Sequence, residues 1–374
     1  MIDGGDDGMP IDNNVANCGN GISEPGEICF KAPLRIDLGI TGVFDAQFVD
    51  ANGDGQRDLA FLTATGYAFR INNGGIFSNV NTSGPGVPGS TRMRGVNLGG
   101  SDAVAELVDN NKMTGTVEIW EWNGAAHARI GMIGSETNDA QGIAVGRTTG
   151  ASDPPSIAMV FTSRLRIFQL PTGDALSPLA QSGSGFAITG GKDVAVGDID
   201  KDLLDEIAVA NNSGLEVFRN VSSTIVKISS PNIGGGADAV VTCDVDGDQD
   251  DEFVYSIKST AGGPGRVGAA RWMAASWEPP APRTIPGMSA PVDCADFDKD
   301  GHDDAVVVAT TGGDVDTLIL RGRADGAFEA PIPFRILDGV TQIHANVDFN
   351  NDEVPDIIMT SPVMGLVTIL QSNP

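Results

Sequence analysis

The stretch DIDKDLLDEIA, residues 198–208, places acidic side chains at alternate positions and leads directly into an apolar pair. The same arrangement returns as DANGDGQRDLA (50–60), DVDGDQDDEFV (244–254), DFDKDGHDDAV (296–306) and DFNNDEVPDII (348–358). The copies begin at residues 50, 198, 244, 296 and 348, so the intervals between them are 148, 46, 52 and 52 residues. A period near fifty residues indicates a repeat architecture, and the interval of 148 has room for two further copies.

Two degenerate copies occupy that interval. The segment GVNLGGSDAVAELV (95–108) keeps the strand–loop–strand outline with Asn97 at the first loop position, and GIAVGRTTGASDPPSIAMV (142–160) keeps it with Arg147 there. Each repeat contains short segments of two-residue alternation, such as KDVAVGD (192–198), separated by Gly, Asn, Ser and Pro turns. This pattern is typical of β-strands and shows no helical period. Seven repeats of about four strands each are therefore expected.

The expected fold is an all-β, seven-bladed β-propeller with four-stranded blades, formed by residues 33–374. The segment LRIDLGI (34–40) is a spare strand before the first repeat, and the last repeat lacks its fourth strand. We expect these to pair and close the ring, which leaves no exposed sheet edge. Two stacked β-domains or a sandwich are the alternative. Residues 1–32 are interpreted as an acidic linker. The blades are expected at about 41–92, 93–139, 140–190, 191–237, 238–288, 289–340 and 341–374 plus 33–40.

Residues 33–374 resemble the FG-GAP/VCBS repeats of integrin-α-like seven-bladed propellers, on the acidic loop that recurs five times and on its period. The resemblance implies an extracellular, calcium-binding propeller that acts as a non-catalytic binding or adhesion module. It implies as partner a protein or glycan on a cell surface or in the extracellular matrix. A lectin that binds carbohydrate on the propeller surface is the alternative, since some lectins resemble this propeller. A polysaccharide lyase or hydrolase is the second alternative.

The acidic loops have the chemistry of a hard-cation site. Three carboxylates within five residues repel one another, and a divalent cation removes that repulsion. Calcium takes roughly six to eight oxygen ligands; side chains at loop positions 1, 3 and 5, the carbonyl at position 7 and the acid at position 9 would contribute to such a site. An oxygen-only donor set disfavours zinc and copper. We expect about five structural Ca²⁺ sites; the alternative is acidic surface turns in which Asp is a turn former. The expected ligands are Asp50, Asn52, Asp54 and Asp58; Asp198, Asp200, Asp202 and Glu206; Asp244, Asp246, Asp248 and Glu252; Asp296, Asp298, Asp300 and Asp304; and Asp348, Asn350, Asp352 and Asp356.

The loops depart from one another in two respects. Glycine occupies position 6 only as Gly55 and Gly301, so we expect some distortion in the other three loops. Position 9 is Glu in the fourth and fifth blades, where it could bind with two oxygens. The third blade offers Arg147 and Thr149 in its loop, and we expect no metal there; the second blade is similarly unsuited.

The four cysteines fit no zinc site, because no C-x-x-C occurs. The segment CGNGISEPGEIC (18–29) resembles the short cysteine-rich repeat of secreted myxobacterial proteins, although Phe30 stands where that repeat has Asp. We expect a Cys18–Cys29 disulfide, which suits an extracellular chain; two free thiols in a flexible tail are the alternative. Cys243 and Cys294 lie just before the loops of neighbouring blades and either form an inter-blade disulfide or are two small buried thiols.

The chain has 374 residues with 50 acidic and 23 basic side chains, which gives a formal net charge of −27. This charge argues against nucleic acid and anionic membrane surfaces as partners, because both are polyanions. The five loops contain 23 of the 50 acidic residues, so nearly half of the acid belongs to the candidate cation sites. No apolar run is long enough for a transmembrane helix. We expect a monomer that is secreted or anchored at the outer surface, from which a leader segment has been removed.

Few residues suggest catalysis, and we assign no catalytic residue. His127, His302 and His344 lie in different repeats, and no Ser-His-Asp or Cys-His spacing is present. Tyr67 and Tyr255 could act as lyase bases, although a lone Tyr in a strand is ordinarily a core residue.

Aromatic residues are the better candidates for a ligand surface. Trp120 and Trp122 lie two residues apart on one face of an expected strand in the second blade, with Arg92 and Arg94 nearby. They form either a platform for a sugar or partner side chain, or packing between blades. A second tryptophan pair lies in RWMAASWEPP in the fifth blade.

Overall fold

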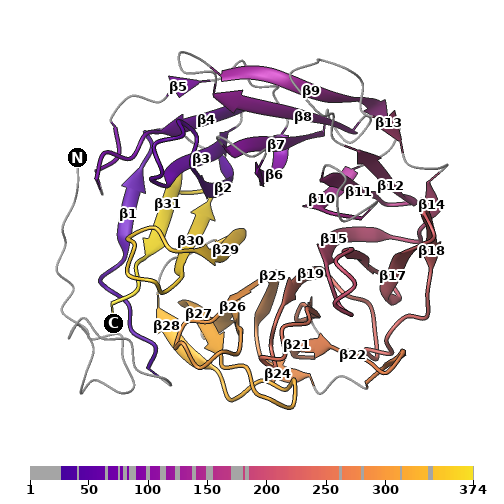
Figure 1. Cartoon of the computed structure of the whole chain (residues 1–374). Helices are drawn as coiled ribbons and strands as arrows, with labels where there is room; N and C mark the ends of the chain where they lie inside the picture. The colour runs from indigo at the N-terminus through magenta and orange to yellow at the C-terminus, as the bar shows by residue number, and fades with distance from the viewer. Residues whose placement is uncertain are drawn as a thin grey trace.

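The structure, a computed structural model, describes residues 27–373 with interruptions. The segments outside the description are 40–41, 64–65, 75, 79–81, 84–89, 98–101, 110–114, 123–126, 137–139, 149–154, 170–179, 182–184, 261–262, 279–281, 312–313 and 336–339. Within the described ranges the regular structure is entirely β-strand, and no helix there could cross a bilayer. The strands lie in sheets arranged around a ring, as in a β-propeller (Figure 1). The expected all-β propeller class is confirmed.

The sheets follow one another along the chain and are named A to G here. Sheet A contains β2 (Val43–Val49), β3 (Asp58–Thr63), β4 (Gly66–Arg70) and β5 (Thr82–Ser83). Sheet B contains β6 (Ser90–Asn97), β7 (Asp102–Asp109), β8 (Gly115–Trp122) and β9 (His127–Glu136). Sheet C contains β10 (Ala140–Gly146), β11 (Ser156–Phe161), β12 (Arg164–Gln169), β13 (Ala180–Gln181) and β14 (Phe186–Ala187).

The second half of the chain continues this order. Sheet D contains β15 (Gly191–Gly197), β16 (Glu206–Asn211), β17 (Gly214–Val221) and β18 (Thr224–Lys227). Sheet E contains β19 (Ala239–Cys243), β20 (Glu252–Ile257), β21 (Gly265–Ala270) and β24 (Arg283–Ile285), and the hairpin of β22 (Trp272–Met273) with β23 (Ser276–Trp277) follows β21. Sheet F contains β25 (Met288–Ala295), β26 (Asp304–Thr311), β27 (Asp314–Leu320) and β28 (Ile332–Arg335). Sheet G contains β29 (Gln342–Val347), β30 (Asp356–Ser361), β31 (Leu366–Leu370) and β1 (Leu34–Asp37).

Six of these sheets, counted over the described ranges, have four strands in a row, as expected, whereas sheet C has five. Both of its short outer strands pair with β12. Strand β13 pairs with Phe168 and Gln169 at one end of β12, and β14 pairs with Arg164 and Leu165 at the other. The two short strands therefore share the outer edge of this sheet.

The N-terminal strand joins the C-terminal sheet, as the sequence predicted. Strand β1 pairs antiparallel with β31, and Leu34 lies opposite Ile369. Sheet G in turn packs against sheet A, where the Phe48 and Phe349 rings are stacked with centroids 4.8 Å apart. The first and last sheets are therefore in direct contact.

The hydrophobic core lies between the faces of neighbouring sheets. One cluster combines Ala158 and Ile167 of sheet C with Val194 and Val209 of sheet D, and the other neighbouring sheets share similar clusters. The second strand of a sheet is covered on both faces, so β16 (EIAVAN) is buried at every position. Such a strand is recognised by its continuous apolar run rather than by alternation.

Aspartates also tie neighbouring sheets together beside the acidic loops. The Asp251 N–H donates to the Asp198 carbonyl (3.0 Å), and Asp251 Oδ2 accepts from the Asp198 N–H (2.9 Å). The same two-bond contact joins Asp303 to Asp244 and Asp205 to Arg147. Each contact links the loop of one sheet to the end of the first strand of the preceding sheet, along sheets C to F.

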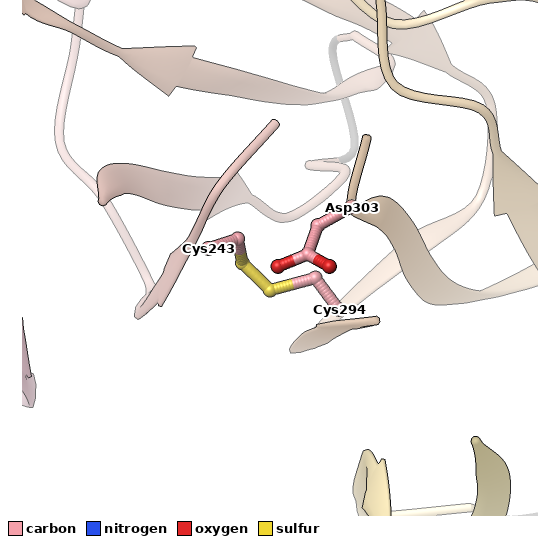
Figure 2. A group of neighbouring side chains, drawn as sticks. All are labelled: Cys243, Cys294 and Asp303. Atoms are coloured by element: carbon pink, nitrogen blue, oxygen red, sulfur yellow. A yellow bond between two sulfur atoms is a disulfide. The ribbon is translucent and has the colours of Figure 1, made fainter. Parts of the chain in front are cut away.

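Cys243 and Cys294 form a disulfide between the first strands of sheets E and F, with their Cα atoms 6.2 Å apart (Figure 2). The inter-blade bridge is therefore present, and the alternative of two thiols is wrong. The Asp303 carboxylate lies beside this bridge, so a disulfide and a carboxylate contact reinforce the same interface. Cys29 is also disulfide-bonded, while Cys18, its expected partner, lies outside the described residues.

Candidate metal centre

The five acidic loops occupy equivalent places in the fold, because each joins the first strand of a sheet to the second. They are named here after their sheets, and positions 1 to 9 are residues 50–58 in loop A, 198–206 in loop D, 244–252 in loop E, 296–304 in loop F and 348–356 in loop G. Position 9 is in each case the first residue of the second strand, which fixes the depth of that acid in the propeller.

The carboxylate at position 1 organises its own loop through backbone hydrogen bonds. In loop F, Asp296 Oδ1 accepts from the Asp300 N–H (3.1 Å) and Oδ2 from the Gly301 N–H (3.0 Å). The Asp300 carboxylate then accepts from the His302 N–H (2.9 Å). Equivalent bonds recur in loops A, D, E and G. The side chains at positions 1, 3 and 5 are consequently held on the inside of the same turn.

Positions 4 and 6 are left-handed in every loop, whether or not the residue is glycine. At position 6 the φ angles are 81° for Gly55, 70° for Leu203, 71° for Gln249, 88° for Gly301 and 70° for Glu353. The expectation that three loops are distorted because they lack glycine is wrong. The carboxylate–backbone bonds impose the conformation, and the side chains at 203, 249 and 353 accept the strain of a positive φ.

Where the acid at position 9 is Asp, it is buried and its carboxylate accepts hydrogen bonds from two separate backbone segments. Asp304 is fully buried, and its Oδ2 accepts from the Phe297 N–H (3.2 Å) and Oδ1 from the Gly322 N–H (2.9 Å). Asp58 and Asp356 make the same pair of contacts. This carboxylate therefore joins the loop to the end of the third strand, a role that sequence spacing did not indicate.

The acids converge to different degrees in the five loops. Possible ligand atoms lie within 4.8 Å of one another in three groups: Asp198, Asp200 and Glu206; Asp244, Asp246 and Asp248; and Asp296, Asp298 and Asp300. In loop A the position-3 residue is Asn52, whose Nδ2 donates to Asp54 Oδ2 (2.9 Å). In loop G it is Asn350, whose Nδ2 donates to the Ser372 carbonyl (3.2 Å).

Two of the three convergent groups, those of loops D and E, have a buried oxygen suited to a cation. Asp200 Oδ1 and Asp244 Oδ1 are buried oxygens that accept no hydrogen bond within the described part of the chain. A buried carboxylate oxygen without a donor is costly, and a hard cation satisfies it. Together with the neighbouring carboxylates, these oxygens give the donor set that calcium prefers.

Burial of the acids changes their protonation. It raises the pKa of Asp58 and Asp356 to about 6, of Glu206 to about 7 and of Glu252 to about 8. It also raises the pKa of Asp298 to about 6, to which the adjacent Asp300 contributes. These carboxylates are therefore ionised at a cost near neutral pH, which a bound cation would offset.

Three arginines that sequence reasoning missed lie against the loops of sheets D, E and F. Arg219 Nη2 is 2.7 Å from Asp200 Oδ2 and its Nε is 2.9 Å from Glu206 Oε1. Arg271 pairs with Asp246 through Nη2, and Arg321 Nε is 3.0 Å from Asp298 Oδ2. The available signal was a basic residue near the end of the third strand in three repeats.

The two cysteines near Asp303 also lie within ligand distance of one another, but they do not form a metal centre. Their sulfur atoms are joined in a disulfide, whereas a metal needs the thiolate. Within sheet C, the Arg147 N–H donates to Asp205 Oδ2 (2.5 Å), which places this loop position in the inter-sheet contact. Thr149 and the Asn97 side chain lie outside the description.

Of the two alternatives for the second-blade tryptophans, the platform is not supported at Trp120. This side chain is only 5% exposed and packs with Phe69 and Met93 between sheets A and B, so packing between blades is its role. The Trp122 side chain lies outside the described residues. Arg92 and Arg94 instead line a cavity of about 510 Å³ bounded by the first strands of all the sheets.

The fifth-blade tryptophans also pack against the protein. Trp272 and Trp277 face each other across the β22–β23 hairpin, with ring centroids 5.0 Å apart. The Trp277 indole N–H donates to the Ser229 carbonyl (2.6 Å), and the Arg219 guanidinium lies 5.2 Å from the Trp272 ring centroid. The hairpin therefore reaches from sheet E onto sheet D.

The two tyrosines and His344, considered above for catalysis, lie in the core or in contacts between sheets. Tyr67 and Tyr255 are fully buried, and burial raises the pKa of the Tyr255 hydroxyl, which opposes its use as a base. His344 Nε2 lies 2.7 Å from Asp45 Oδ1, although the two residues are 299 positions apart. Asp45 Oδ2 also accepts from the Met93 N–H (2.8 Å), so this cluster joins sheets G, A and B. The His127 side chain lies outside the description.

Comparison with protein-family models and with curated proteins gives no match to this sequence. The interpretation of the site therefore depends on its own geometry.

Proposed function

We propose that this chain is a calcium-stabilised β-propeller of the FG-GAP/VCBS type that acts as an extracellular, non-catalytic binding module. The observation that carries the proposal is the repeated loop: five loops at equivalent places adopt one conformation, with acidic side chains turned to the same side. Alternating acidic positions with a left-handed turn suit a calcium ion, which takes carboxylate, amide and carbonyl oxygens.

The proposal includes seven blades. The two short outer strands of sheet C divide one edge between them, so that sheet is equivalent to a four-stranded blade. Sheets A to G then correspond to the seven sequence repeats. The disulfide between sheets E and F favours an oxidising compartment, in agreement with a secreted or outer-surface protein.

Calcium titration of chelator-treated protein tests the metal sites. We expect heat of binding in calorimetry and a higher melting temperature, because a ligand that binds only the folded state stabilises it by about 2.7 kcal/mol per site at a hundredfold excess over Kd. Magnesium is the control, since it retains its waters and should stabilise less. The double variant Asp296→Asn/Asp300→Asn should lose one site. Absence of both heat and a melting shift with calcium would exclude the proposal.

The ligand of the module is proposed to be a protein or glycan on a cell surface, by resemblance to integrin-like propellers. The carbohydrate alternative is distinguished by a glycan array with and without calcium. Binding of a defined glycan would assign a lectin, whereas binding to extracellular-matrix proteins alone would assign an adhesion module. A lyase function receives no support from the buried Tyr67 and Tyr255.

A further inference from the structure

The arginines beside loops D, E and F occur only where loop position 3 is an aspartate. In these loops position 3 is an aspartate, and each of the three is in an ion pair with an arginine: Asp200 with Arg219, Asp246 with Arg271 and Asp298 with Arg321. In loops A and G position 3 is Asn52 or Asn350, which carries no charge. The arginine therefore occurs where the additional carboxylate occurs.

The structure identifies the equivalent of the arginine in loops A and G. The N–H of Gly322, immediately after Arg321, donates to the position-9 acid Asp304. In loop A the Asn72 N–H makes this contact and in loop G the Ser372 N–H does so. The residues before them, Ile71 and Gln371, occupy the arginine position and are uncharged. Arginine is thus absent from that position in both loops that have asparagine at position 3.

The consequence is a constant charge. Loops D, E and F each have four carboxylates at positions 1, 3, 5 and 9 and a guanidinium at the arginine position, whereas loops A and G have three carboxylates at those positions and an uncharged residue, Ile71 or Gln371, at the arginine position. Every loop therefore carries a net charge of −3 from these positions. Like charges in a partly buried turn repel strongly. A fourth carboxylate without a guanidinium beside it would therefore destabilise the calcium-free loop.

The guanidinium groups are partly buried beside the loop carboxylates, where their electrostatic interaction with them is strong. The arginine side chains are 18%, 14% and 26% exposed for Arg219, Arg271 and Arg321, so solvent screens them only in part. Arg219 additionally lies over the Trp272 ring from the neighbouring sheet, with its Cζ 5.2 Å from the ring centroid. A guanidinium fixed in this way loses less freedom on pairing with a carboxylate.

We propose that Arg219, Arg271 and Arg321 are charge-compensating positioning residues, which hold loops D, E and F in shape without calcium and weaken calcium binding there. The proposal rests on the calcium sites proposed above. Each guanidinium occupies an oxygen of the position-3 aspartate and places a positive charge beside the cation. Removal of an arginine then has two opposite effects: the loop binds calcium more tightly, and the calcium-free protein becomes less stable.

Arg321→Gln tests the proposal, because glutamine is the residue that loop G has at this position. We expect one class of calcium sites to bind on the order of tenfold more tightly in calorimetry, since a unit charge near the ion is removed. In chelator the melting temperature should fall below that of the wild type, and saturating calcium should recover most of the difference. Arg266→Gln, which removes an arginine that contacts the Gly234 carbonyl, is the matched control for net charge and should change neither quantity.

The double variant Asp298→Asn/Arg321→Gln recreates the asparagine–glutamine combination of loop G and restores a net loop charge of −3. It should be as stable in chelator as the wild type and bind calcium with wild-type affinity. The converse variant Asn350→Asp adds an acid where no arginine compensates it. It should bind calcium more tightly and melt at a lower temperature in chelator, and it keeps the proposal testable if Arg321→Gln does not fold.

The outcomes separate this proposal from the proposed function. If the wild-type protein binds no calcium, both are wrong. If the wild type binds calcium but Arg321→Gln and Asn350→Asp bind it no more tightly, the calcium sites stand and the role of the arginines is wrong. Tighter binding together with lower stability in chelator supports both.

Discussion

At the scale of single residues, the carboxylate at loop position 1 decides the left-handed backbone at position 6. Leu203 has a φ of 70° and is 68% exposed, so it contributes little packing to offset its strain. Its conformation is imposed by the Asp198 carboxylate, which accepts the Leu203 N–H (2.9 Å). The sequence suggested distortion at this position, but the hydrogen bond outweighs the preference of the side chain.

Leu203→Gly should therefore stabilise the protein. Glycine adopts a positive φ without steric cost, and relief of that strain should exceed the entropy that glycine adds to the unfolded chain by about 0.5 kcal/mol. Chemical denaturation in chelator measures the change. The neighbouring Leu204→Gly is the control and should destabilise, because Leu204 is outside the set of positive-φ residues. A destabilised Leu203→Gly protein would contradict the explanation.

At the scale of elements, the acidic loops couple stability to pH. Burial raises the folded-state pKa of Asp58, Glu206, Glu252 and Asp356 to between about 6 and about 8, above their values of about 4 in an unfolded chain. The folded state then binds protons more tightly than the unfolded state. The stability that these groups contribute is present below about pH 4 and is lost as pH rises through the folded-state values.

The melting temperature of the calcium-free protein should consequently fall as pH rises from about 5 to 8. With saturating calcium the fall should be smaller or reversed, because the cation binds the ionised carboxylates. Thermal melts across this range, in chelator and in calcium, measure both curves. A melting temperature in chelator that does not change with pH would show that burial does not raise the folded-state pKa of these acids.

The interface between sheets E and F should be the most strongly tied of those described. It combines the Cys243–Cys294 bridge, which closes a separation of 51 residues, with the contact between Asp303 and Asp244. Cys243→Ser/Cys294→Ser should lower the free energy of unfolding by about 2–4 kcal/mol, in line with loop-closure entropy. Denaturation of the double variant measures this loss, and reductant should lower the stability of the wild type more than that of the variant, which keeps the Cys29 disulfide.

At the scale of the whole molecule, the last sheet is completed by a strand from the other end of the chain. Ile36 of β1 is 8% exposed and lies opposite Val367 of β31. A truncation that removes residues 1–40 should leave β31 as an unpaired edge, which lowers the melting temperature and favours self-association. Size-exclusion chromatography and thermal melts check this. Removal of residues 1–26 alone is the control. If the two truncations have the same melting temperature and the same degree of self-association, β1 does not stabilise the last sheet.

The sequence by itself determined the class of fold, the pairing of the N-terminal strand with the last sheet and the five acidic loops. Alternation and carboxylates at odd positions depend only on nearby residues, and the spacing near fifty residues is a period of the sequence that leaves one N-terminal strand over for the last sheet. It could not determine that Trp120 is buried between sheets, that Asp303 ties two sheets, or that Arg321 pairs with Asp298.

Only the tertiary structure decided those contacts, because each joins segments that the fold brings together from separate strands or sheets. The clearest case is His344 beside Asp45, where the chain must close on itself before the two side chains can meet. Sequence periodicity specifies which residues belong to each sheet. Which faces of neighbouring sheets meet depends on how the sheets pack around the ring. The partners of the buried charges are therefore decided only by the tertiary structure.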